Sequence, residues 1–237
     1  MNIFVKGNYI MYMLAKDHIF SLILSLAISS IFIIIPMFLK KKNKKNYFSI
    51  LAIFFTLFQI LEMLVKIYVE GDVVQKSLPL QLTNISIIFG IIYLFSRKNW
   101  SYNILFYLSV FNILSIIYPI RFEYHTILKP FFYIFNNLLA IDILILGKMN
   151  FKNKITKKGL YTSIFIYVFS FLIMWKLVNP KLVTNYMYTH EYMLDFMRFI
   201  KPFNLYLLLL VLGKALLMTI VYLIHNILAK RKRVGKS

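Results

Sequence analysis

The sequence predicts an all-α polytopic membrane protein, a bundle of seven transmembrane helices with its N-terminus outside and its C-terminus in the cytoplasm. Composition is the first reason. Of the 237 residues, 60% are hydrophobic and only 15% are charged, against about 45–50% and about 25% in a soluble domain. The other reasons are seven long apolar segments and the alternation of charge between the loops that join them. This composition excludes an ordinary soluble enzyme and a disordered chain.

The apolar segments are long enough to cross a bilayer, because a helix needs about 20 residues to span a hydrocarbon core of about 30 Å. We expect the spans to be His18–Leu39, Tyr47–Val69, Leu80–Phe95, Asn103–Ile120, Ile127–Gly147, Leu160–Val178 and Phe203–Leu228. The third and fourth are the shortest. Five of the six prolines fall at or near these boundaries, where a missing N–H costs little. Pro36, in the last turns of the first span, is expected to kink that helix.

Charge in the connecting segments sets the orientation. Four of them carry 17 basic residues and no Asp or Glu: Lys40–Lys45, Arg97–Lys98, Lys148–Lys158 and Lys230–Lys236. The acids of the other side are Asp17, Glu70, Asp72, Glu123, Glu191 and Asp195. The positive-inside rule places the basic side in the cytoplasm. We therefore expect an outer interfacial segment at residues 1–17, one transmembrane domain at 18–228 and a basic cytoplasmic tail at 229–237.

Several chemistries are excluded by residue content. The chain has no cysteine, which rules out disulfides, thiolate catalysis and cysteine-ligated metals. The net charge of +20 is spread over short loops, which indicates contact with anionic lipid head groups and no nucleic-acid partner. His190-Glu191 begins the zinc motif H-E-x-x-H, but position 194 is Leu, so the second ligand is missing. We expect no metal and no cofactor.

Ionisable side chains inside the second span are the first candidate site, because charge within a membrane is costly. Gln59, Glu62 and Lys66 lie at i, i+3 and i+7 and share one helix face. Glu62 and Lys66 are in the favourable order for an i,i+4 ion pair. Two interpretations stay open: a structural ion pair, or Glu62 lining a substrate cavity.

Two further charges lie deep in the predicted spans. Lys214 is close to the middle of the seventh span, and Asp142 lies within the fifth. A buried charge needs a partner. The sequence predicts an Asp142–Lys214 pair, with Glu62–Lys214 as the alternative.

Uncharged polar residues gather toward the predicted outer side. Gln81, Thr83 and Asn84 stand at the start of the third span, and Asn136 follows in the fifth. Small polar residues of this kind often join helices, but they would also line a pocket open to the outer leaflet. We expect this pocket to be lined by Glu62, Gln81, Asn84, Asn136, Asn185, Tyr186 and His190, with His125 above it.

Several motifs, in order from about His18 to Leu212, resemble the YwaF-like family of bacterial integral membrane proteins, which is related to the transmembrane protein 164 acyltransferase. Leu61-Glu62 looks like the family's helix-two glutamate. The segment Leu78-Pro79-Leu80-Gln81-Leu82-Thr83-Asn84-Ile85 is similar to its Leu-Pro-Leu-His-Leu-Cys-x-Ile segment. Thr184–Tyr188 and Leu194-Asp195-Phe196 are similar to its closing motif.

The resemblance implies a lipid substrate and a catalytic cysteine and histidine. Thr83 stands at the position of that cysteine, and Asn136 at the position of the histidine in the fifth span. An asparagine cannot take the proton of a hydroxyl nucleophile. Any surviving catalysis would use Thr83 with His125 as its base, in a lipid acyltransferase or hydrolase with a non-cysteine nucleophile.

The function predicted from these features is lipid handling in the bacterial plasma membrane, either by a divergent acyltransferase-like protein or by a protein that only binds lipid. Membrane lipids are the expected partners. A small-solute transporter is the alternative, with Glu62, Asp142 and Lys214 along its path, because transport needs polar groups in both halves of the bilayer. A non-catalytic membrane subunit is the third possibility.

Overall fold

The computed structural model describes residues 9–11, 15–119 and 122–234. They are almost entirely helical, and the chain divides into two compact units, Met1–Asn153 and Lys154–Ser237. Six helices are long and apolar enough to cross a membrane within the described residues. The all-α membrane bundle is therefore confirmed.

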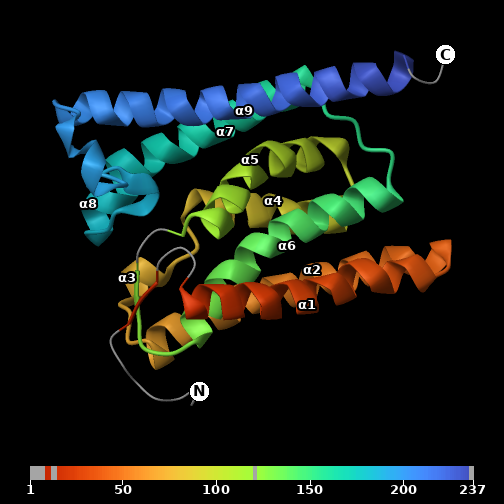
Figure 1. The fold of residues 1–237 in the computed structure, drawn as a ribbon, viewed down its shortest axis with the longest axis horizontal. Helices are drawn as coiled ribbons and strands as arrows, with labels where there is room; N and C mark the ends of the chain where they lie inside the picture. The colour runs from red at the N-terminus through yellow and green to blue at the C-terminus, as the bar shows by residue number, and fades with distance from the viewer. Residues whose placement is uncertain (1–8, 12–14, 120–121, 235–237) are drawn as a thin grey trace. The chain divides into compact units, whose positions relative to one another are not determined.

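The described residues of the first unit form five long helices and one short one, which Figure 1 shows. They are α1 (Lys16–Phe38), α2 (Lys41–Leu64), α3 (Val74–Ser77), α4 (Leu82–Ser96), α5 (Asn99–Ile117) and α6 (Leu128–Asn150). A π-helical turn, η1 (Val65–Val69), extends α2. The most buried long helix is α6, which packs against α1, α2, α4 and α5.

Two glycines let these helices approach closely. A Cβ at Gly147 of α6 would lie 2.6 Å from the ring of Tyr102 on α5, and one at Gly90 of α4 would lie 2.6 Å from Ile143 on α6. Cβ contacts this short are essentially never observed, so a larger residue at Gly147 would displace the ring of Tyr102, and one at Gly90 would displace the end of the Ile143 side chain.

A short sheet ties the start of the chain to the entry of α6. Strand β1 (Tyr9–Met11) pairs antiparallel with β2 (Phe122–Tyr124). Met11 is fully buried in a cluster with Ile116 and Leu138. The expected outer segment at 1–17 thus contributes a core residue, because strand pairing satisfies its backbone. Most of the segment lies outside the described residues.

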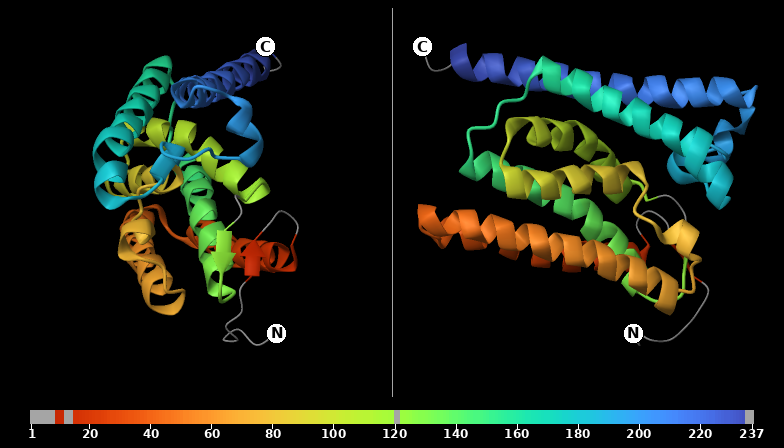
Figure 2. Two further views of the ribbon diagram at one scale, coloured as in Figure 1. Left: turned by 90° about the vertical axis from the view of Figure 1, so that its left-hand side faces the viewer. Right: turned by 180° about the vertical axis from the view of Figure 1, so that it is seen from behind.

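The second unit consists of two long helices joined by irregular turns. The elements are α7 (Lys157–Ile173), the π-helical turn η2 (Met174–Val178), α8 (Asn179–Leu182), the 3₁₀ turns η3 (Tyr186–Tyr188) and η4 (Asp195–Phe199), and α9 (Phe203–Val234). Helix α7 begins where Thr156 Oγ1 accepts a hydrogen bond from Gly159 N (3.0 Å). Helices α7 and α9 lie side by side (Figure 2).

Every predicted span coincides with a helix, but the third is short. Helix α4 has 15 residues, which gives about 22 Å at 1.5 Å per residue, less than the core thickness. Residues 78–81 precede α4. Pro79 disfavours helix at Leu78, and Gln81 is still extended, so the helix begins at Leu82. The count of seven crossings stays a prediction.

The basic segments of the first unit meet at one end of its helices. Arg97 Nη2 donates to the Lys45 carbonyl (2.9 Å), and Lys44 Nζ donates to Asn150 Oδ1 (2.9 Å). This arrangement is what the alternation of loop charges requires. Which end faces the cytoplasm stays a prediction from the charges.

Reporter fusions test that orientation. Fusions after Lys45, Lys154 and Lys236 are expected to read cytoplasmic, and fusions after Asp72 and Lys181 extracytoplasmic, because the first group follows acid-free basic segments. An extracytoplasmic signal at Lys236 would contradict an odd number of crossings from an outer N-terminus.

Candidate functional site

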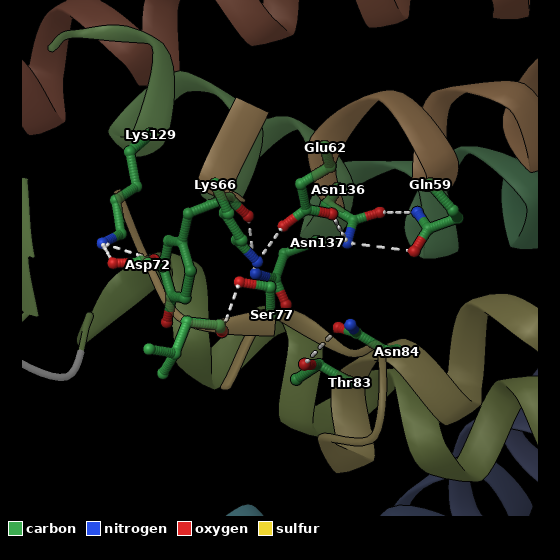
Figure 3. A network of polar contacts seen from close by, with 12 residues as sticks. Gln59, Glu62, Lys66, Asp72, Ser77, Thr83, Asn84, Lys129, Asn136 and Asn137 are labelled. Carbon is green, nitrogen blue, oxygen red and sulfur yellow. Dashed lines mark hydrogen bonds and ion pairs between the residues drawn. The ribbon is translucent and has the colours of Figure 1, made fainter. Parts of the chain in front are cut away.

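Helices α2 and α6 carry a connected polar network in the interior of the first unit (Figure 3). Glu62 is 4% exposed. Its Oε1 lies 2.5 Å from Lys66 Nζ, and its Oε2 accepts a hydrogen bond from Asn136 Nδ2 (2.8 Å). Gln59 Nε2 donates to Asn136 Oδ1. The predicted face of Gln59, Glu62 and Lys66 is therefore confirmed, and Asn136 joins it from α6.

One end of the network lies where α2 changes from α-helix to π-helix. Lys66 lies in the π-helical turn η1, and such turns are rare and frequent at functional sites. Asn137, next to Asn136, donates to the Tyr133 carbonyl (2.7 Å). Both asparagines are 3% exposed. The amide side chains of these two residues of α6 are thus buried between helices.

Thr83 lies at the start of α4, beside the network in Figure 3. Its hydroxyl donates to Asn84 Oδ1 at 3.4 Å. The Thr83 carbonyl accepts hydrogen bonds from Ser86 Oγ (2.5 Å) and Asn112 Nδ2 (3.3 Å). Gln81 caps the helix through its backbone, because its carbonyl accepts from Asn84 N (3.0 Å). These contacts fix the backbone around Thr83 and leave its side chain half-buried.

His125 stands in the loop between β2 and α6, which is held by a buried carboxylate. Glu70, 3% exposed, accepts hydrogen bonds from His125 N (2.6 Å), Thr126 N (3.0 Å) and Thr126 Oγ1 (2.5 Å). Asp72 forms an ion pair with Lys129 (2.8 Å) in the first turn of α6. These contacts bring the end of α2 and the entry of α6 together.

The importance of Glu70 could not be predicted from the sequence, where it appeared only as one acid among those of the outer side. The available signal was its position directly after an apolar span and before Gly71, whose φ of +74° turns the chain. Nothing in the sequence indicates that its hydrogen-bond partners would come 55 residues later.

The two deep charges have different surroundings. Asp142 of α6 is 3% exposed and interacts with Ser29 of α1. Lys214 of α9 lies in the second unit, with its Nζ 5.6 Å from the ring centroid of Tyr167 and 6.0 Å from that of Tyr188. Cation–π contacts of this kind stabilise an ammonium group. The pairing of Asp142 with Lys214 stays a prediction.

The remaining candidates lie in the second unit, in the turns between α7 and α9. Asn185 Oδ1 accepts hydrogen bonds from His190 N (2.9 Å) and Glu191 N (3.1 Å). Tyr186 is buried, whereas His190 is exposed. The structure thus brings Glu62 and Asn136 together, with Gln81, Thr83 and Asn84 at α4. It groups Asn185, Tyr186 and His190 separately, so the single pocket stays a prediction.

Asn179 organises these turns and was not among the predicted residues. Its Oδ1 accepts from Thr184 Oγ1 (2.7 Å) and Tyr186 N (3.0 Å), and its Nδ2 donates to the Tyr186 carbonyl (2.8 Å) and Thr189 Oγ1 (2.7 Å). A buried amide whose oxygen and nitrogen both form hydrogen bonds can satisfy backbone groups that are not paired in a helix or strand.

Removing this amide should therefore loosen the second unit. Asn179→Ala is expected to lower the free energy of unfolding by about 2 kcal/mol, because it leaves buried donors and acceptors without partners. Thermal unfolding followed by tryptophan fluorescence measures the change. Asn204→Ala, at an exposed position of α9, is the matched control and should have little effect.

Comparison with known proteins assigns the chain to a family. The sequence profile of the TMEM164 family matches residues 13–224. The chain belongs to the TMEM164 family. It is also 24% identical over 198 residues to an uncharacterised protein of Treponema pallidum (strain Nichols), covering 83% of this chain and 82% of the relative. No solved structure matches it.

Family membership and the apolar helices together establish a multipass membrane protein. The match covers the polar network of α2 and α6, Thr83, and the turns around Asn179. The resemblance expected from the Leu78–Ile85 segment and the closing motif is thereby confirmed at the level of the family.

Proposed function

We propose that this TMEM164-family protein binds a membrane lipid in the bacterial plasma membrane and does not transfer acyl chains by cysteine–histidine chemistry. The observation that carries the proposal is the environment of Asn136. Its amide is engaged on both sides, by Gln59 and by Glu62. It stands where the resemblance implies a histidine, and an amide offers no basic nitrogen.

Lys66 supports a lipid head group as the ligand. An ammonium group has three N–H donors, and the ion pair with Glu62 uses one of them. The Lys66 side chain is 23% exposed, against 6% for Glu62, so its remaining donors are the accessible part of the network. A phosphate oxygen is the acceptor that membrane lipids present most abundantly to such a group.

Lipid binding can be measured on the purified protein by native mass spectrometry in the presence of glycerophospholipid. Lys66→Met is expected to weaken binding about tenfold, because a hydrogen bond to a charged group is lost. Lys76→Met is the matched control, since Lys76 is exposed on α3. Equal loss in both variants would mean that only general surface charge attracts the lipid.

Acyl transfer with a threonine nucleophile is the competing hypothesis. A base must lie within about 2.6–3.2 Å of the hydroxyl or reach it through one water. His125 is the candidate base, in a loop held by Glu70. Turnover of acyl chains by the wild type, abolished by both Thr83→Ala and His125→Ala, would establish catalysis and refute binding alone. We expect no turnover in the wild type.

A further inference from the structure

A polar stripe runs along α1, a helix that is otherwise apolar. His18, Ser21, Ser25 and Ser29 lie at i, i+3, i+7 and i+11, on one face, and each is at most 3% exposed. The stripe extends for about 16 Å, at 1.5 Å per residue. Its neighbours Ile23 and Leu26 are 62% and 50% exposed, as expected of lipid-facing side chains. The polar face of α1 is therefore turned inward.

Helix α1 packs against α6, which contributes the buried Asp142. Asp142 interacts with Ser29 of α1. Tyr47 of α2 is close enough to interact electrostatically with the same carboxyl group. We call the five residues His18, Ser21, Ser25, Ser29 and Asp142 the α1–α6 seam.

Four residues of the seam have a buried polar atom without a hydrogen-bond partner among the described residues. These atoms are His18 Nδ1, Ser21 Oγ, Ser25 Oγ and Asp142 Oδ2. Buried polar groups in proteins are bonded to protein, water or an ion in the great majority of cases. Four such atoms on two helices in contact indicate a shared, non-protein partner.

Close helix packing alone does not explain the seam. Serines allow helix backbones to approach, which would account for Ser21, Ser25 and Ser29. A dry interface would nevertheless leave the carboxylate oxygen of Asp142 unpaired in an apolar medium. Asp142 also belongs to none of the three ion pairs found among the described residues.

We propose that the α1–α6 seam holds ordered water and that Asp142, at its deep end, binds a small monovalent cation, either Na⁺ or a proton. Carboxylate and hydroxyl oxygens are the hard donors that such a cation takes. Water in the seam satisfies the hydroxyls of Ser21 and Ser25 and links Asp142 to the His18 end. This function is separate from lipid binding at Glu62 and Lys66, and it concerns the residue on which the transport alternative depends.

Water in the seam can be tested with single cysteines, because the chain has none of its own. Ser25→Cys and Ser29→Cys place a thiol in the seam with little change in volume. Ile23→Cys and Leu26→Cys are controls on the lipid-facing side of the same helix. A small, positively charged thiosulfonate should modify the seam cysteines at least about tenfold faster, because only a hydrated thiol ionises. Equal, slow rates at all four positions would overturn the hydrated seam.

The cation site can be tested on the native residue with a hydrophobic carbodiimide, which modifies protonated carboxyl groups buried in membranes. Labelling is measured by peptide mass spectrometry at constant pH and ionic strength, in sodium chloride or choline chloride. Asp142→Asn locates the label, and the Glu62→Gln background removes the buried carboxyl group of the polar network on α2 and α6.

The outcomes are distinct. Labelling of Asp142 that sodium slows at least about tenfold identifies Na⁺ as the ligand, and labelling at equal rates in both salts identifies the proton. No labelling in either salt overturns the cation site. Labelling that appears only in Lys214→Met also overturns it, since Lys214 would then be the partner of Asp142. Loss of lipid binding in Lys66→Met should leave the labelling of Asp142 unchanged.

Discussion

Glu70→Ala is expected to lower the free energy of unfolding by about 3 kcal/mol or more. The carboxylate is buried and accepts three hydrogen bonds from His125 and Thr126. Hydrogen bonds to a charged group each contribute about 1.5–3 kcal/mol, and the donors left behind remain buried. Without the Glu70 carboxylate, the loop that leads into α6 loses these hydrogen bonds. We therefore expect His125 to become more mobile as the protein becomes less stable.

Thermal and denaturant unfolding in detergent, followed by tryptophan fluorescence, measure this effect. Glu70→Gln keeps one oxygen acceptor and is expected to retain part of the stability. Glu123→Ala is the matched control, because Glu123 is an exposed glutamate on the neighbouring strand β2 and surface substitutions change stability by about 0.5 kcal/mol or less. Equal destabilisation by the two alanine variants would contradict the role assigned to Glu70.

The second large effect is a gain of activity. If Thr83 and Asn136 occupy the positions of the family's cysteine and histidine, Thr83→Cys combined with Asn136→His should create acyl transfer from a glycerophospholipid. Glu62 Oε2, which accepts from Asn136 Nδ2 at 2.8 Å, would accept from a ring N–H of the new histidine and hold its tautomer. The other ring nitrogen would then be free to deprotonate the thiol.

Covalent acyl-enzyme formation, detected by intact mass, and lipid products, detected by mass spectrometry, report this gain. The double variant should form the thioester at least about 100-fold faster than Thr83→Cys alone, which is the usual contribution of a general base. Adding Glu62→Gln should reduce the rate again. An unmodified thiol in a folded double variant would show that residue 136 does not face residue 83 and would weaken the proposed alignment.

The membrane architecture follows from local properties of the chain. Every predicted span is helical, because long apolar runs in a bilayer have to satisfy their backbone internally. The face shared by Gln59, Glu62 and Lys66 was predictable for the same reason, since it depends on helical spacing alone. The late start of α4 was harder to predict, because the extended segment that contains Pro79 continues as far as Gln81.

The assembly of the site depended on contacts between distant segments. Asn136 meets Glu62 across 74 residues, and Glu70 holds Thr126 across 56. No local pattern encodes such pairs, because they result from which helices pack together. The turns that precede α9 depend on such contacts as well, because Asn185 engages the backbone of His190 and Glu191 ahead of the 3₁₀ turn at Asp195–Phe199. Hydrophobic length and charge thus specify the helices and their alternation, whereas the partners of each buried polar group emerge only when the helices are packed.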